Sequence, residues 1–127
     1  MPVKLRKDEQ TVMKKSNVVL IGMPGAGKST VGVVLAKILG YKFVDTDLVI
    51  QEKEGRLLKE IIADEGNDGF LEIEDRINAQ LEAEDSVIAP GGSVVYGENA
   101  MRHFKDIATV VYLKASYETI NERLSNL

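Results

Sequence analysis

The sequence predicts an α/β fold of three layers, α/β/α, built around a short parallel sheet. Two observations predict it. Short apolar runs rich in β-branched residues alternate along the 127 residues with longer stretches of helical periodicity, and a glycine-rich loop joins the first such run to the first helical stretch. Strands that alternate with helices form βαβ crossovers, so we expect parallel strands with helices on both faces of the sheet.

Four strands and four helices are expected from these patterns. The strands cover residues 17–21, 41–45, 86–90 and 109–113, and the helices cover residues 29–39, 69–84, 98–104 and 116–127. Gly40 is expected to end the first helix, and Ser116 to cap the last one. In the second helix Phe70, Ile73, Ile77 and Leu81 are three or four residues apart, which places them on one face.

The loop GMPGAGKS, residues 22–29, carries a nucleotide signature. Gly22, Gly27, Lys28 and Ser29 fit the pattern G-x-x-x-x-G-K-[ST], in which backbone N–H groups surround phosphates. Lys28 is expected to bridge the β and γ phosphates and to act in catalysis, Ser29 to ligate Mg²⁺, and Thr30 to support the first helical turn. The expected residues for binding ATP are Gly25, Ala26, Gly27, Lys28, Ser29 and Thr30.

The segment FVDTD places two acids at the end of the second expected strand. Side chains one residue apart on a strand point the same way, so we expect Asp45 and Asp47 to face whatever lies above the sheet. Alone, such aspartates are equally typical of a turn or a helix cap. Beside a P-loop they predict a water-mediated Mg²⁺ contact from one carboxylate and proton acceptance or orientation of a substrate hydroxyl by the other.

The segment APGGSVV places two glycines after the third expected strand. A Gly-Gly pair alone indicates a turn. Facing a P-loop, Gly91 and Gly92 let backbone N–H groups approach a γ-phosphate or an acceptor closely, so these glycines and Ser93 are expected at the substrate.

Composition excludes several partners. A net charge of −4 argues against sequence-independent binding of nucleic acid. The apolar runs are far shorter than the roughly 18 to 20 residues that cross a bilayer, so we expect no membrane partner. The absence of cysteine is compatible with a reducing compartment, and we expect a cytoplasmic protein.

Residues 1–16 are expected to form a loose extension and residues 17–127 one core.

Together these residues resemble the shikimate kinases, small P-loop kinases of the nucleoside-monophosphate-kinase fold. GMPGAGKST, FVDTD, GRLLKEIIADEGNDGFLEIE and PGGSVV have the order and spacing of that family. The resemblance implies ATP and Mg²⁺ bound by Lys28 and Ser29, Asp45 at the metal, and Asp47 as the base at the acceptor hydroxyl. It also implies a role in aromatic amino acid biosynthesis.

The sequence departs from the family pattern in its second half. The family's F-R-x-x-E motif reads FLEIE here, so Leu71 stands in place of an arginine that binds the shikimate carboxylate, and Glu74 lacks that partner. The family continues after the position of Leu127 into a lid and a further strand. Neither Arg56 nor Arg76 is expected to substitute, and Arg76 is expected to pair with Glu72.

Three other side chains are expected to be structural. His103 is predicted to play an exposed or half-buried structural role on a short helix. Tyr112 alternates within a strand and is expected in the core. Tyr96 follows the glycine turn and is expected to pack, with an acceptor wall as its other interpretation.

Three functions stay open from the sequence. The first is an ATP-dependent kinase acting on a hydroxyl of a small metabolite, shikimate or a related alcohol. The second is an ATP-binding homologue or shortened chain without kinase activity, which would bind ATP without releasing ADP. The third is a switch or assembly module, which would change oligomeric mass with ATP. A homodimer, in which a second copy covers an open edge of the sheet, is also left open.

Overall fold

Four parallel strands form the sheet of the computed structural model, which describes residues 16–22 and 27–113. Their order across the sheet is β2-β3-β1-β4. The strands are β1 (Asn17–Gly22), β2 (Lys42–Asp45), β3 (Ser86–Ala89) and β4 (Ala108–Leu113). This arrangement confirms the α/β class and the four expected strands to within a residue or two. The expected extension, except for Ser16, and the expected last helix lie outside the described residues.

Helices connect the strands. They are α2 (Lys28–Leu39), α3 (Thr46–Glu54), α4 (Leu58–Ala79), α5 (Glu98–Ile107) and a short 3₁₀ helix, η1 (Gly92–Tyr96). The helix expected over residues 69–84 is wrong at both ends, because α4 begins at Leu58 and ends at Ala79. Glu60 allows the earlier start, since its side chain accepts a hydrogen bond from the N–H of Leu57 at 3.1 Å. None of the helices in residues 27–113 has the length and apolar character that a membrane span requires.

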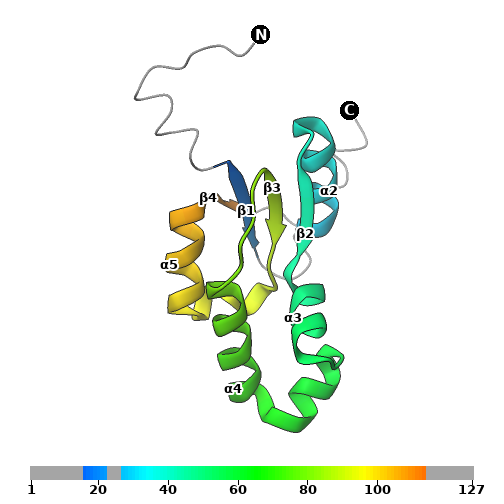
Figure 1. The fold of residues 1–127 in the computed structure, drawn as a ribbon, viewed down its shortest axis with the longest axis vertical. Coiled ribbons are helices and arrows are strands. Elements are labelled where there is room, and N and C mark those ends of the chain that lie inside the picture. Colours follow the sequence, from blue (N-terminus) through cyan, green and yellow to red (C-terminus); the bar gives the residue numbers. More distant parts are fainter. Residues whose placement is uncertain (1–15, 23–26, 114–127) are drawn as a thin grey trace.

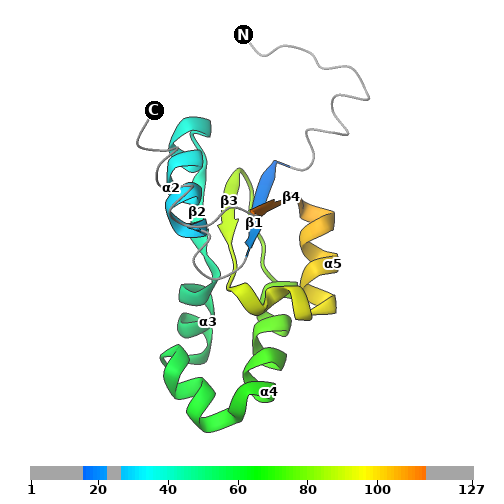
Figure 2. The same ribbon diagram turned by 180° about the vertical axis from the view of Figure 1, so that it is seen from behind.

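Helices cover both faces of the sheet, which makes the three expected layers (Figures 1 and 2). Alternate residues of β1 serve the two faces. Leu20 packs toward Ala36 of α2, whereas Val19 and Ile21 pack toward Phe104 of α5. Burial on both faces explains why the strands are continuous apolar runs.

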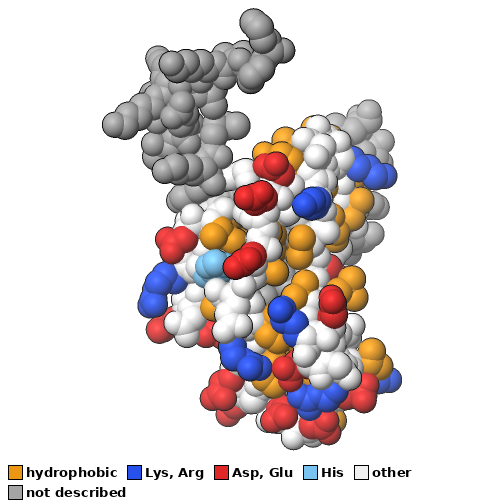
Figure 3. Space-filling model, viewed as in Figure 1, with side chains coloured by type: hydrophobic (Ala, Val, Ile, Leu, Met, Phe, Trp, Pro, Cys, Tyr) orange, Lys and Arg blue, Asp and Glu red, His pale blue; other side chains and the backbone are white. Residues whose placement is uncertain are grey.

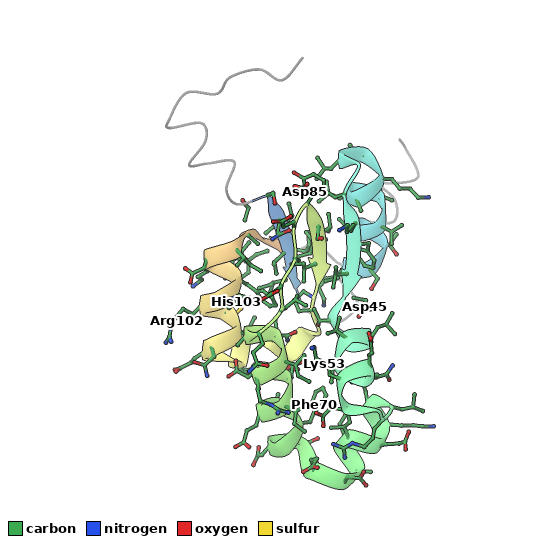
Figure 4. All side chains as sticks on the ribbon, viewed as in Figure 1. Asp45, Lys53, Phe70, Asp85, Arg102 and His103 are labelled. Atoms are coloured by element: carbon green, nitrogen blue, oxygen red, sulfur yellow. The ribbon has the colours of Figure 1, made fainter. Side chains whose placement is uncertain are left out.

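A third core lies between α3 and α4, which extend together below the sheet in Figure 1. Ile50, Ile61 and Ile77 are buried there, and Phe70 packs against them, between the two helices in Figure 4. Leu81 does not join this face as expected. Because α4 ends at Ala79, Leu81 packs in the core on the α5 side.

Helix α4 bends at Gly66, and a network of charges lies near the start of this helix. Gly66 has a φ of 75° and interrupts the helix, a conformation that favours glycine. Arg56 contacts Glu54 at 2.8 Å and Asp64 at 3.0 Å, and Arg76 contacts the other oxygen of Glu54 at 3.4 Å. Figure 3 shows acidic and basic side chains gathered at this lower end of the molecule.

Asp75 of α4 fixes the start of α5. Its Oδ1 accepts a hydrogen bond from the N–H of Ala100 at 2.7 Å, and its Oδ2 accepts one from the Nδ2 of Asn99 at 2.9 Å. The approach requires the glycine at position 97, since a Cβ there would lie 2.5 Å from Oδ1 of Asp75. A residue of one helix therefore caps another.

Replacing Asp75 by alanine should lower the free energy of unfolding by about 1 kcal/mol, because a side-chain cap of this kind typically contributes that amount. Urea denaturation measures it. Glu72→Ala is the matched control, since Glu72 is exposed on the same helix and its side chain forms no hydrogen bond or ion pair with another described residue. Equal losses in the two variants would contradict the capping role.

Candidate active site

The phosphate end of the site is the start of α2. Gly27 adopts a left-handed conformation, φ 78°, immediately before the helix. The Nζ of Lys28 donates a hydrogen bond to the carbonyl oxygen of Gly22 at 2.8 Å, which holds the ammonium group at the end of β1. Of the residues expected to bind ATP, Gly25 and Ala26 lie outside the described residues.

The first turn of α2 is suited to a polyanion. Ser29 and Thr30 are exposed in that turn, and it contains no acidic residue. The unpaired N–H groups and the positive end of the helix dipole attract phosphate. The expected roles of Ser29 and Thr30 remain predictions.

Asp45 and Asp47 lie at the junction of β2 and α3, where Figure 4 shows Asp45. The expectation that both belong to one strand is wrong, because β2 ends at Asp45 and Asp47 is in the first turn of α3. Asp45 caps this helix, since its Oδ1 accepts a hydrogen bond from the N–H of Asp47 at 2.9 Å. The cap still keeps both carboxylates at the carboxyl end of β2.

The end of β3 brings a third carboxylate to this place. A Cβ at Gly91 would lie 3.2 Å from the Oδ1 of Asp47 and 3.1 Å from the Oε2 of Glu74, closer than side-chain carbons normally approach. The hydroxyl of Ser93 donates a hydrogen bond to the Oε1 of Glu74 at 2.7 Å. The structure therefore brings together Asp47, Glu74, Gly91 and Ser93, and Gly92 is the first residue of η1.

Burial and mutual repulsion raise the proton affinity of these carboxylates. Burial raises the pKa of Asp47 above its ordinary value, the charge of Asp45 raises it further, and the Lys28 ammonium lowers it. Burial also raises the pKa of Glu74, the Ser93 hydrogen bond lowers it, and the charges of Asp47 and Asp75 raise it. The phosphate end and the carboxylates lie at the same edge of the sheet, because the parallel strands β1 and β2 both end there.

Glu74 was not among the site residues expected from the sequence. From the sequence, Glu74 is expected only to lack the arginine partner that it has in the family pattern. In the structure it is 2% exposed and faces Asp47. A glutamate on the apolar face of a helix, one turn after Phe70 and next to Ile73, was the signal that could have identified it.

The two arginines considered as substitutes pair elsewhere. Arg56 is bound to Glu54 and Asp64 at the lower end of the molecule. Arg76 pairs with Glu54 across the α3–α4 corner, so its expected pairing with Glu72 is wrong. The partner is separated by 22 residues in the chain, which helical spacing alone could not indicate.

Of the three side chains expected to be structural, His103 forms a hydrogen bond, and Tyr112 and Tyr96 lie on the surface. His103 is half-buried, and its Nε2 donates a hydrogen bond to the carbonyl oxygen of Leu81 at 2.6 Å. Tyr112 is 54% exposed rather than in the core, because β4 is the edge strand of the described sheet. Tyr96 is 77% exposed, so its expected packing role is also wrong.

The protein side chains at this site fit a metal ion that is held mainly by water and phosphate oxygens. The described residues contain no group of three or more His, Cys, Asp or Glu side chains placed to hold a metal ion. Mg²⁺ in phosphate-binding sites is typically held by one or two protein groups, with water and phosphate oxygens completing the shell. Ser29 and Asp45 could supply these two groups. The helix cap uses only the Oδ1 of Asp45, so its Oδ2 could face the ion.

Replacing Glu74 by glutamine should change the pH dependence of stability. Because the pKa of Glu74 is raised on folding, the stability present below the unfolded value of about 4.3 is lost as the pH rises through the folded pKa. The free energy of unfolding of Glu74→Gln, relative to the unsubstituted protein, should therefore increase between pH 4 and pH 7. Urea denaturation across this range tests it, with Glu72→Gln as the control. A constant difference would contradict the shift.

The chain matches known proteins over most of its length. The shikimate kinase family model matches residues 24–127. The shikimate kinase of Sulfurihydrogenibium sp. is 41% identical over 111 residues, which are 87% of this chain and 67% of that protein. The shikimate kinase of Persephonella marina is 39% identical over 108 residues, which are 84% of this chain and 66% of that protein.

A solved structure has the same fold. The shikimate kinase from Acinetobacter baumannii, in complex with shikimate, matches with a TM-score of 0.75 and 33% identity, over 89% of this chain and 64% of that one. The chain spans about two thirds of the length of these relatives. The agreement of family model, sequence and structure confirms the resemblance in the motifs, and the chain belongs to the shikimate kinase family.

Proposed function

We propose that this protein transfers the γ-phosphoryl group of ATP to a hydroxyl of a small metabolite, shikimate or a related alcohol. The observation that carries the proposal is that Lys28, held at the end of β1, and the half-buried carboxylate of Asp47, directly after the end of β2, lie at the same carboxyl edge of the parallel sheet. A cation suited to phosphate and a carboxylate suited to a hydroxyl thus belong to one edge of the sheet. The solved relative that binds shikimate supports a small hydroxylated acceptor.

The start of α2 holds the donor. The backbone N–H groups after Gly27 and the helix dipole bind the phosphates, and Lys28 exchanges its bond to the carbonyl oxygen of Gly22 for the β and γ phosphate oxygens. Ser29 and Asp45 are the groups that would hold Mg²⁺. When bound, this ion neutralises charge on the phosphates.

Asp47 receives the proton of the acceptor. The hydroxyl oxygen forms a bond to the γ-phosphorus, the bond from that phosphorus to the bridging oxygen of ADP breaks, and the hydroxyl proton passes to Asp47 and then to solvent. The raised pKa of Asp47 suits this role, because a stronger base takes the proton more readily. The products are ADP, a phosphate ester and one proton.

The glycines after β3 shape the acceptor side. Gly91 leaves the space that a side chain would fill between Asp47 and Glu74. Gly92 and Ser93 follow at the start of η1, where Ser93 holds Glu74. We assign these three residues to the acceptor and the γ-phosphate.

Replacing Asp47 by asparagine should lower acceptor-dependent ADP release by about 10² to 10⁴-fold, the usual contribution of a general base. ATP binding should persist, because Asp47 does not hold the phosphates. Coupled ADP assays and calorimetry measure the two properties. Glu52→Gln, an exposed change on α3, is the control. ATP binding without ADP release from the unsubstituted protein, over a panel of small alcohols, would favour a binding protein instead.

Replacing Lys28 by alanine should weaken ATP binding and abolish turnover, because the ammonium is the cation nearest the expected phosphates. Calorimetry with ATP tests it, and Lys37→Ala, an exposed change in the last turn of the same helix, is the control. Unchanged affinity for ATP would remove Lys28 from the site.

A cytoplasmic location, a homodimer and a role in aromatic amino acid biosynthesis stay predictions from the sequence.

A further inference from the structure

A surface cavity of about 520 Å³ lies between the loop that precedes β3 and the second half of α5. Its apolar lining comes from Leu81, Ala83 and Ile107. The strands β2 and β3 begin beside it, at Lys42 and Ser86, so the cavity lies at the amino edge of the sheet. The proposed active site lies at the carboxyl edge, and the proposed transfer step does not use this cavity.

The first residue of β1 holds two walls of the cavity together. The side chain of Asn17 is buried, and its Nδ2 donates hydrogen bonds to the carbonyl oxygens of Ala83 at 2.8 Å and Ile107 at 3.1 Å. Its Oδ1 accepts a hydrogen bond from the N–H of Ser86 at 3.0 Å. One side chain therefore joins the loop before β3 to the end of α5, and the cavity between them is preformed.

The chain enters β1 at the rim of this cavity. The Oγ of Ser16 accepts a hydrogen bond from the N–H of Asp85 at 3.1 Å, and the carbonyl oxygen of Asp85 accepts one from the N–H of Lys42 at 2.9 Å. These bonds hold Asp85 in a left-handed conformation, φ 49°, which aspartate tolerates better than most residues. Figure 4 shows Asp85 at the end of the sheet where β1 begins. The residues that precede Ser16 therefore leave the fold beside this loop.

The loop and the segment before Ser16 carry opposite charges. Glu82, Glu84 and Asp85 are exposed, and Figure 3 shows acidic side chains beside the single histidine. They outnumber Lys42, the basic side chain of the cavity lining. The sequence directly before Ser16 is VMKK, residues 12–15, which places two lysines next to the anchored serine. Attraction between the two is therefore built into the sequence at the point where the chain is already fixed.

The same segment also supplies an apolar side chain within reach of the cavity. Met13 precedes Ser16 by three residues, and an extended chain spans about 3.5 Å per residue, so Met13 lies within about 11 Å of Ser16. Methionine is flexible and fills irregular apolar gaps. The lining of Leu81, Ala83 and Ile107 offers it an apolar surface.

We infer that the cavity at the amino edge is a docking site for residues 12–15 of the same chain. Met13 packs against the apolar lining, and Lys14 and Lys15 lie at the acids of the loop. The inference goes beyond the proposed phosphoryl transfer and does not depend on it, since the cavity and the proposed active site lie at opposite edges of the sheet. Changes in this segment should therefore leave ADP release unchanged.

An engineered disulfide tests the docking, because the chain contains no cysteine of its own. Met13→Cys combined with Ala83→Cys should form an intrachain disulfide about tenfold faster or more than Met13→Cys combined with Asp106→Cys, since docking raises the local concentration of one thiol at the other. Asp106 is the matched control, because it is exposed and next to Ile107 but does not line the cavity. Rates are normalised to the reactivity of each single cysteine with glutathione.

Two results of this experiment would overturn the inference. Equal normalised rates for the two pairs would show that the segment does not prefer the cavity. A disulfide that forms only between two chains, seen as a dimer on a non-reducing gel, would assign the cavity to a second copy of the protein.

His103 gives a second test without a cross-link. It is the only histidine of the chain, it lines the cavity, and its Nε2 is bound to the carbonyl oxygen of Leu81. Its ring signals in NMR spectra should shift in Met13→Asp, because a charged side chain is unfavourable against an apolar lining. Val3→Asp, the same kind of change farther from Ser16, should leave them in place.

Charge reversal tests the role of the lysines. Lys14→Glu combined with Lys15→Glu should shift the His103 signals as Met13→Asp does, whereas Lys4→Glu combined with Lys7→Glu should not. Unchanged signals in both Met13→Asp and the Lys14 and Lys15 variant would overturn the docking. ADP release, measured on the same samples, reports on the proposed function alone, so the two ideas can fail separately.

Discussion

The close approach of two carboxylates to the backbone of Gly91 is the constraint on which the rest of this structure depends. Asp47 and Glu74 come from different helices, and both reach the end of β3 because no side chain occupies that position. For Glu74 to arrive there, α4 must run directly beneath η1. Consecutive residues of a helix point about 100° apart, so the next residue, Asp75, faces α5 and caps it. One helix thus closes the site and positions its neighbour.

This arrangement divides the site by charge. The end at α2 has Lys28, a helix N-terminus and no acid in its first turn, whereas the opposite side has the half-buried carboxylate of Asp47 and the buried one of Glu74. Under the proposed function, the first half attracts the phosphates of the donor and the second half repels them. Burial and then the charge of Asp45 raise the pKa of Asp47, and under the proposed function the same effects make this carboxylate a better proton acceptor.

The sequence predicted local features well and distant contacts poorly. The four strands and α2 follow from short-range patterns, and the structure has them where expected, while residues 23–26 of the predicted P-loop lie outside the described residues. The extent of α4 could not be read, because Gly66 breaks its periodicity and looks like an end. Arg76 pairs with Glu54, and Tyr112 lies at the sheet edge, through long-range geometry that helical or strand spacing does not encode. The position of Glu74 at the site could not be predicted for the same reason, since its neighbours Ser93 and Asp47 belong to other elements.

Acceptor choice is separable from the fold in this protein. The sheet is held by two cores that contact α2 and α5, while the α3–α4 pair that carries the acceptor side has its own core around Ile50, Ile61 and Ile77. Replacing a half-buried residue of α4 such as Leu71 by a charged residue would change the charge of the acceptor side, and it would leave both cores of the sheet intact. Family membership read from the sheet and the P-loop therefore constrains the phosphate donor more tightly than the acceptor, because the two are built on different layers of packing.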